Sequence, residues 1–270
     1  MASADSSITV VLVPGAWHGP DCWDLLKDHL TPFNCVAVTL PSVGCHPASE
    51  PTKSWTPDVN AIGEAGSKAI VRSEVIVLVS HSYGSIVASG ALKRVSIAGR
   101  TKFKHIVLCG GQQQRSADSN AAHSDVWDVR GDLIFLNQPA KYFYGGPEQP
   151  AQDRWAAAAK RTHMPIVSFR SMATYAAWKD VATLYALTEE DNVVPLARQL
   201  SMVAEAQKKG ALVTTASLPS GHFPMLTMPD RVATMIRDMA RANPLNEAWK
   251  EEHMRCHRER RSLQHKGPKA

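Results

Sequence analysis

Short apolar segments rich in β-branched residues alternate along this 270-residue chain with longer segments in which apolar residues recur at helical spacing. Strands that are apolar at consecutive positions are buried on both faces, which is typical of parallel sheets covered by helices. The pattern therefore predicts an α/β fold with a mostly parallel sheet and helices on both faces. The expected strands are 8–13, 36–40, 75–79, 105–109, 181–187 and 212–216. The expected helices are 21–30, 57–72, 85–94, 195–208 and 229–241.

The alternation of strands and helices stops between residues 110 and 178. This segment is polar and rich in glutamine, alanine and aromatic residues, and we find no strong strand pattern in it. We expect helices there over 124–136, 151–161 and 166–177. The predicted domains are a core of residues 1–109 and 179–245, a helical cap insertion of residues 110–178, and a charged C-terminal tail of residues 246–270.

Composition excludes several classes of protein. The formal net charge is +5, but residues 247–270 hold seven Lys or Arg against four Asp or Glu, so the body is too weakly basic to predict a nucleic-acid surface. The five cysteines are scattered without a CxxC pair, which argues against zinc sites and disulfide frameworks. The N-terminus lacks the pattern of a signal peptide, and no apolar stretch is long enough to span a bilayer. We expect a cytoplasmic protein that binds neither membranes nor nucleic acid.

The strand expected at residues 75–79 ends abruptly at a serine flanked by small residues. The sequence Ser80-His81-Ser82-Tyr83-Gly84 is followed at once by a helical pattern. A sharp turn from strand to helix lifts the apex hydroxyl above the sheet edge, which is the physical basis of the G-x-S-x-G nucleophile elbow. Here serine replaces the first glycine of that motif. The alternative is a serine that only caps the following helix.

A serine hydroxyl needs a base, and the base needs an acid that orients it. The elbow motif predicts the chain order Ser, then Asp or Glu, then His. After the strand expected at residues 181–187, an acidic turn offers Asp191 as the acid, with Glu190 as the second choice. These acids could instead only favour the N-terminus of the next helix.

His222 is the predicted base, because it follows a glycine in the loop after the strand expected at residues 212–216. From that loop a histidine can reach across the sheet edge to Ser82. His81 is the rival by proximity in sequence, but the residue directly before a nucleophile points away from the place where its base must lie.

Residues 13–19 form a glycine-containing turn after the first expected strand. Such a turn can direct a backbone amide into the site, and the amides of Ala16 and Tyr83 are the predicted oxyanion hole. The alternative is an ordinary turn between a strand and a helix.

Aromatic residues near these loops indicate where a substrate could bind. Trp17, His18 and Phe223 adjoin the predicted site residues and are candidates for the substrate pocket. Packing between cap and core is the favoured role for most other aromatic residues, namely Trp127, Tyr142, Phe143, Tyr144, Trp155 and Trp178. We predict no metal site, because the spacing of His253 and His257 is more typical of a charged helix face.

The opening segment VVLVPGAWHGPDCWDLLKDHL resembles the start of the small plant-type methylesterase and hydroxynitrile lyase group of the α/β-hydrolase superfamily. The resemblance extends over about residues 8–241. The matching positions are Gly15, Ala16, His18, Gly19 and Trp23, while Pro14 replaces the first histidine of the group's pattern. The resemblance implies an eight-stranded, mostly parallel sheet with a small helical cap, and a triad of Ser82, Asp191 and His222.

Two residues favour a hydrolase over a lyase. The lyases of this group carry a threonine at the position of Gly15 and a lysine directly after the base histidine, where this chain has Phe223. We therefore predict a carboxylic ester hydrolase, of the serine esterase or lactonase type, that cleaves a small or medium apolar carboxylic ester, lactone or thioester through an acyl-enzyme on Ser82. No cofactor is expected, and a homodimer is left open. The alternatives are a lyase or cyclase that uses His222 as general base, and a non-catalytic ligand-binding protein.

Overall fold

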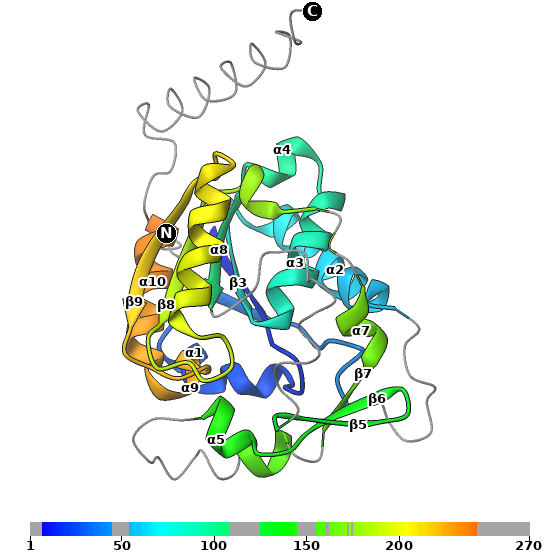
Figure 1. Cartoon of the computed structure of the whole chain (residues 1–270). Helices are drawn as coiled ribbons and strands as arrows, with labels where there is room; N and C mark the ends of the chain where they lie inside the picture. The colour runs from blue at the N-terminus through cyan, green and yellow to red at the C-terminus, as the bar shows by residue number, and fades with distance from the viewer. Residues whose placement is uncertain are drawn as a thin grey trace, which may run out of the picture.

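The computed structural model of the chain describes residues 7–44, 54–108, 125–144, 155–159, 162–171, 173 and 175–241. Its central sheet is parallel throughout, with the strand order β2-β1-β3-β4-β8-β9 (Figure 1). The strands are β1 (Ile8–Val13), β2 (Asn34–Ala37), β3 (Val75–His81), β4 (Phe103–Leu108), β8 (Thr183–Thr188) and β9 (Val213–Leu218). The predicted parallel sheet is therefore confirmed, although this sheet contains six strands among the described residues rather than the eight expected.

Burial explains why the inner strands are apolar at consecutive positions. Every residue of β1 and β4 is buried, whereas β9 at the sheet edge is buried only at its two ends. The register aligns Val13 with Ser80, and Thr188 with Leu218, so the C-terminal ends of these strands reach one edge of the sheet. In open parallel sheets, ligands bind outside this edge.

Helices cover the sheet where the sequence pattern predicts them. Helices α2 and α3 pack on each other and against β1, α8 packs on β8 and β9, and α10 packs on β3 and β4 (Figure 1). Residues three to four positions apart in α10, such as Val232 and Ile236, form its buried face. The helices of the core are η2 (Pro20–Trp23), α1 (Asp24–Asp28), α2 (Thr56–Arg72), α3 (Tyr83–Arg94), α4 (Ile97–Arg100), α8 (Leu196–Lys208), α9 (Pro224–Thr227) and α10 (Pro229–Arg241).

The segment expected to form a mostly helical cap contains a second sheet, which the sequence pattern did not predict. Three antiparallel strands pair in the order β5-β6-β7, over β5 (Trp127–Arg130), β6 (Leu133–Leu136) and β7 (His163–Pro165). The expected helix over 124–136 is a hairpin instead, because Gly131 turns the chain at φ 59°. Its residues also alternate between apolar and polar, as in Trp127-Asp128-Val129-Arg130.

Short helices complete the described part of this segment. They are α5 (Pro139–Phe143), α7 (Ile166–Arg170) and η4 (Ala177–Lys179), with a further helical turn over 155–159. The helix expected over 166–177 therefore ends at Arg170. The expected strand over 36–40 lies earlier, as β2. The predicted tail of residues 246–270 lies outside the described residues. Within the described part of the chain, no helix combines the length and the apolar character needed to cross a membrane.

Candidate active site

Ser82 lies in a strained turn between β3 and α3. Its backbone has φ 48° and ψ −123°, a conformation that residues other than glycine rarely adopt. The turn is held on both sides, because the Ser82 amide donates to the Leu108 carbonyl at 3.0 Å and the Ser82 carbonyl accepts from the Ser85 amide at 2.9 Å. This is the backbone geometry that the elbow motif predicts.

Two glycines allow the turn after β1 to approach this elbow. A Cβ atom on Gly84 would lie 2.2 Å from the Pro14 carbonyl oxygen, and one on Gly15 would lie 2.6 Å from Nδ1 of His81 and 3.3 Å from Cβ of Ser82. Only glycine fits at such distances. The turn that carries Ala16 is therefore packed directly against Ser82, although the two are 66 positions apart in sequence.

Ser80, which replaces the first glycine of the motif, forms side-chain hydrogen bonds below the turn. Ser80 is buried, and its hydroxyl lies 2.7 Å from Nε2 of His105 and 3.1 Å from the hydroxyl of Ser85. Burial lowers the pKa of His105 to about 3, so its imidazole is neutral. The extra hydroxyl of Ser80 is thus accommodated by hydrogen bonds below the elbow.

His222 and Asp191 form the pair that the sequence predicts. Nδ1 of His222 lies 2.8 Å from Oδ2 of Asp191, and both side chains are buried. The carboxylate can only accept, so Nδ1 carries the proton and Nε2 of a neutral ring is left as the basic nitrogen. Glu190, the second choice for the acid, is exposed.

The surroundings of Asp191 keep it ionised. Oδ1 accepts from the amides of Val193 at 2.7 Å and Val194 at 2.8 Å, and Oδ2 accepts from the Thr188 hydroxyl at 3.0 Å. Burial alone would raise the pKa of Asp191, but the nearby His222 and these hydrogen bonds outweigh it and hold the pKa below its usual value.

His81 connects the elbow to the loop that carries His222. Its Nε2 donates to the His222 carbonyl at 2.8 Å, and the two rings lie 4.8 Å apart. Burial, together with the charge that His222 can carry, lowers the pKa of His81 well below its usual value. Nε2 of His81, the rival candidate for the base, is therefore occupied by a hydrogen bond to the backbone of the loop that carries His222.

The predicted oxyanion turn has the second strained backbone of the described chain. Trp17 has φ 62°, and Nδ1 of His18 lies 2.8 Å from the Ala16 carbonyl oxygen. Tyr83 is the first residue of α3, so its amide has no acceptor within the helix. Tyr83 directly follows Ser82, and Ala16 follows Gly15, where an added Cβ would lie 3.3 Å from Cβ of Ser82.

The model of the alpha/beta hydrolase family matches residues 10–235.

The chain belongs to the α/β-hydrolase family.

Two relatives match this α/β hydrolase over nearly their whole length. The α/β hydrolase nvfD of Aspergillus novofumigatus is 29% identical over 252 residues, which cover 86% of this chain and 96% of that protein. The probable hydrolase R7 of Phoma sp. is 25% identical over 244 residues, which cover 86% of this chain and 97% of that protein.

Solved structures share the same fold at low sequence identity. A pyrethroid hydrolase from Sphingobium faniae is 20% identical, with a TM-score of 0.64 and coverage of 87% of this chain and 98% of that one. Polyneuridine aldehyde esterase is 17% identical, with a TM-score of 0.68 and coverage of 86% and 99%. Tomato methylketone synthase I is 17% identical, with a TM-score of 0.66 and coverage of 87% and 98%. The predicted superfamily is confirmed, and the comparisons support a hydrolase.

Aromatic side chains from cap and core of the hydrolase meet above the site. Trp17 packs against Trp127, Phe143 and Phe169 at ring-centroid distances of 4.9 to 5.9 Å. Phe143 also lies 5.3 Å from the ring of His222. The cluster gives the surroundings of His222 an apolar character.

The three residues predicted for the substrate pocket, Trp17, His18 and Phe223, are all buried, and the ring of Phe223 lies 5.4 Å from that of His222. The rings of His18 and Phe223 lie 4.2 Å apart, and those of Phe223 and Tyr144 lie 5.1 Å apart. Phe223 therefore connects His18, in the turn after β1, to Tyr144 in the cap.

The side chain of Tyr83 extends the network to α2. Its phenol donates to Oδ2 of Asp58 at 2.5 Å, and Asp58 also accepts from the amide of Ser42 at 2.9 Å and its hydroxyl at 2.6 Å. Burial and the neighbouring Asp58 carboxylate raise the pKa of Tyr83, so it remains a donor. These bonds hold the first residue of α3 against the start of α2.

Sequence reasoning missed Asp58 and His105, and it assigned Tyr144 only to packing between cap and core. A signal exists for the first two, because Asp58 falls on the buried face of an amphipathic helix and His105 interrupts an apolar strand. Nothing near Tyr144 in the sequence indicates that its phenol contacts His18.

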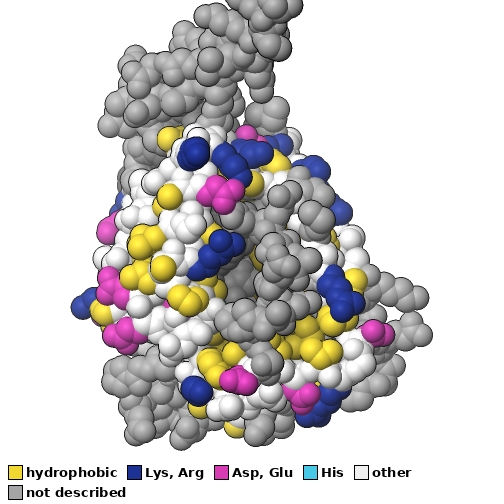
Figure 2. All heavy atoms as spheres, viewed as in Figure 1, with side chains coloured by type: hydrophobic (Ala, Val, Ile, Leu, Met, Phe, Trp, Pro, Cys, Tyr) yellow, Lys and Arg dark blue, Asp and Glu magenta, His cyan; other side chains and the backbone are white. Residues whose placement is uncertain are grey.

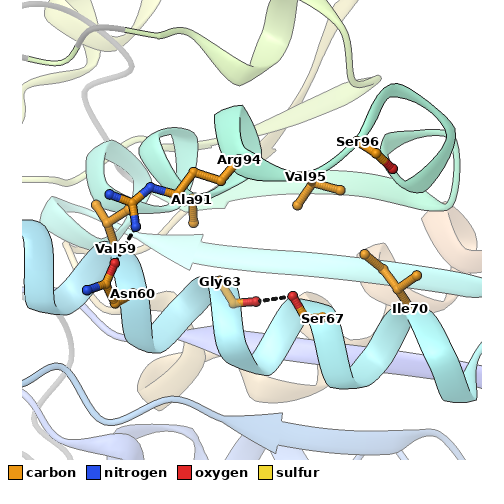
Figure 3. A pocket seen from close by; sticks show the side chains of 9 residues that line it. All are labelled: Val59, Asn60, Gly63, Ser67, Ile70, Ala91, Arg94, Val95 and Ser96. Atoms are coloured by element: carbon orange, nitrogen blue, oxygen red, sulfur yellow. Dashed lines mark hydrogen bonds between the residues drawn. The ribbon is translucent and has the colours of Figure 1, made fainter.

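A surface hollow of about 450 Å³ lies away from the predicted site residues, between α2 and α3. Figure 3 shows the guanidinium of Arg94 reaching across it to Asn60, with which it forms a hydrogen bond. None of the predicted catalytic residues lines this hollow. Among the described residues, no group of three or more His, Cys, Asp or Glu side chains could hold a metal ion.

Proposed function

We propose that this α/β hydrolase is a serine esterase that cleaves a small or medium apolar carboxylic ester, lactone or thioester. The observation that carries the proposal is the strained backbone of Ser82 at the start of α3, opposite the bonded pair of His222 and Asp191 at the same sheet edge. Strain of this kind concentrates at functional sites, where it fixes a reacting group in place.

In the proposed mechanism, Nε2 of His222 takes the proton of the Ser82 hydroxyl as the oxygen attacks the substrate carbonyl. Asp191 holds the ring through Nδ1 and stabilises the imidazolium that forms. The amides of Ala16 and Tyr83 donate to the oxyanion of the tetrahedral intermediate. His222 then protonates the leaving group as the acyl-enzyme forms on Ser82.

Water completes the cycle. His222 removes a proton from a water molecule, which attacks the acyl carbon, and the second tetrahedral intermediate releases the carboxylic acid and Ser82. No cofactor takes part in these steps.

The side chains around the site favour an apolar substrate. The aromatic cluster around Trp17 offers rings rather than charges to an acyl or alcohol group. On the face of the molecule in Figure 2, basic and acidic side chains are interspersed, which favours a small molecule over a nucleic acid as the substrate.

Labelling with a fluorophosphonate probe tests the nucleophile. We expect one adduct on Ser82 by mass spectrometry, no adduct in Ser82→Ala, and labelling at least 10³-fold slower in His222→Ala. Ser67→Ala is the matched control, because Ser67 is an exposed serine on α2 whose hydroxyl bonds only the Gly63 carbonyl among the described residues.

Hydrolysis of p-nitrophenyl esters in the same variants completes the test. We expect turnover to fall with labelling in Ser82→Ala and His222→Ala and to remain in Ser67→Ala. Turnover that survives in Ser82→Ala would contradict the acyl-enzyme. A folded protein that neither labels nor hydrolyses a panel of esters, lactones and thioesters would favour the lyase, cyclase or binding alternatives.

A further inference from the structure

Two hydrogen bonds connect the cap to consecutive residues of the oxyanion turn. Nε1 of Trp17 donates to the Ile134 carbonyl in β6 at 3.0 Å, and Nε2 of His18 is bonded to the phenol of Tyr144 at the end of α5. Both bonds are buried and join residues more than 100 positions apart in sequence. The turn that carries Ala16 is therefore held from the cap as well as from the core.

The direction of the second connection follows from its donors and acceptors. The Ala16 carbonyl can only accept, so Nδ1 of His18 carries the proton and donates to it at 2.8 Å. Burial lowers the pKa of His18 to about 4, so the ring is neutral and Nε2 accepts from the Tyr144 phenol. The chain of donors therefore runs from Tyr144 through His18 to Ala16.

The turn needs this support because of its backbone conformation. Trp17 is a bulky residue at φ 62°, and it lies between Ala16 and His18, which are joined by the bond from the His18 ring to the Ala16 carbonyl. Such a conformation persists only where the surrounding structure over-determines it. Trp17 and His18 are both buried, so water cannot easily replace a lost partner.

We infer that Tyr144 and His18 are positioning residues, which hold the oxyanion turn in its strained conformation and make the geometry of the Ala16 amide depend on the cap. This inference rests on the proposed function, because it gives that amide a role in the reaction. A displacement of about 1 Å in a catalytic group can lower the rate up to 10²-fold, so the bond from a residue that touches no reacting atom can still affect turnover.

The test compares Tyr144→Phe with Tyr142→Phe in the full chain. Tyr142 is the matched control, because it lies two residues earlier, in α5, and its ring lies 4.8 Å from the ammonium of Lys141. With p-nitrophenyl acetate and butyrate, we expect Tyr144→Phe to lower kcat about tenfold and to leave KM within about twofold, since the lost geometry matters in the transition state. Tyr142→Phe should keep both constants.

Substitutions of His18 separate the two bonds of the chain. In His18→Asn, the side-chain amide can take the place of Nδ1 and donate to the Ala16 carbonyl, but it offers Tyr144 no acceptor at the position of Nε2. We expect His18→Ala to lower kcat more than His18→Asn. Tyr144→Phe combined with His18→Asn should be no slower than His18→Asn alone, because residues that act through one chain are not additive.

Equal kcat values for Tyr144→Phe and Tyr142→Phe would overturn the inference, as would multiplicative losses in the double variant. A loss of kcat that follows the loss of thermal stability across all variants would overturn it too, since it would indicate a structural role alone. A different result would contradict the proposed function. If the unmodified chain shows no fluorophosphonate adduct on Ser82, the esterase is wrong, whatever the variants of Tyr144 do.

Discussion

Gly84 has no space for a side chain. Its Cβ would meet the Pro14 carbonyl at 2.2 Å and Cγ1 of Val13 at 3.0 Å, and both belong to the exit of the fully buried β1. A backbone carbonyl cannot move aside as a flexible side chain can. The same close contact brings the turn after β1 to the turn at Ser82, so stability and the geometry of the candidate site both depend on the missing side chain of Gly84.

Gly84→Ala should therefore destabilise the fold by about 1–3 kcal/mol, the usual cost of overpacking a buried site. Urea denaturation followed by circular dichroism measures the change. Gly63→Ala is the control on α2, because a Cβ there meets nothing within 4 Å. In that helix interior alanine should stabilise by roughly 0.5–1 kcal/mol. Equal effects of the two substitutions would contradict the packing argument.

At the scale of elements, the core was predictable and the cap was not. Strands β1, β3 and β4 are buried on both faces, so each contains a run of consecutive apolar residues that predicts a buried strand. The hairpin of β5 and β6 contains only four residues in each strand, too few for a period of two to be distinguished from a helical pattern. Gly131, at the turn of the hairpin, is the residue that could have indicated a hairpin here instead of a helix.

In the candidate site, too, the residues on the core were predictable and the contacts with the cap were not. Ser82, Asp191 and His222 each follow a core strand, and chain order and strand ends predicted the observed pair of Asp191 and His222. The bond between Tyr144 and His18 joins residues 126 positions apart and depends on how the cap folds over the core. No local pattern reports a contact of that kind.

Gly131 tests the hairpin itself. It has φ 59°, and a Cβ added there would meet no atom within 4 Å, so a substitution changes only the backbone preference. Gly131→Ala should destabilise the hairpin by about 1 kcal/mol, while Gly131→Asn should cost less, because asparagine tolerates this conformation. Hydrogen exchange at the amides of β6 measures the local effect. Equal exchange rates in the two variants would contradict the assigned turn.

Over the whole molecule, three buried histidines make stability depend on pH. Burial lowers the pKa of His18 to about 4 and that of His105 to about 3, and it lowers the pKa of His81 well below 6.5. Between pH 6.5 and about 4, the unfolded chain binds protons at His18 and His105 and the native chain does not, and the lowered pKa of His81 acts in the same direction. Stability should therefore fall as pH falls through this window, by up to roughly 1.4 kcal/mol per pH unit for each histidine.

Urea denaturation at pH 7.5, 6 and 5 checks this dependence. His105→Gln should reduce the slope, because it removes one titrating ring while an amide can still bond the Ser80 hydroxyl. Stability that stays constant from pH 7.5 to 5, or an unchanged slope in His105→Gln, would contradict neutral buried imidazoles in the native state.

The hydroxyl of Ser80 and the imidazole of His105 also constrain how this chain can evolve. A return to glycine at position 80 would remove the hydroxyl that lies 2.7 Å from Nε2 of the buried His105 and leave that nitrogen without this partner. An apolar residue at position 105 alone would leave the Ser80 hydroxyl with the Ser85 hydroxyl, at 3.1 Å, as its remaining partner. The two sites should therefore vary together among descendants of a common ancestor, with glycine at one accompanied by a hydrocarbon side chain at the other.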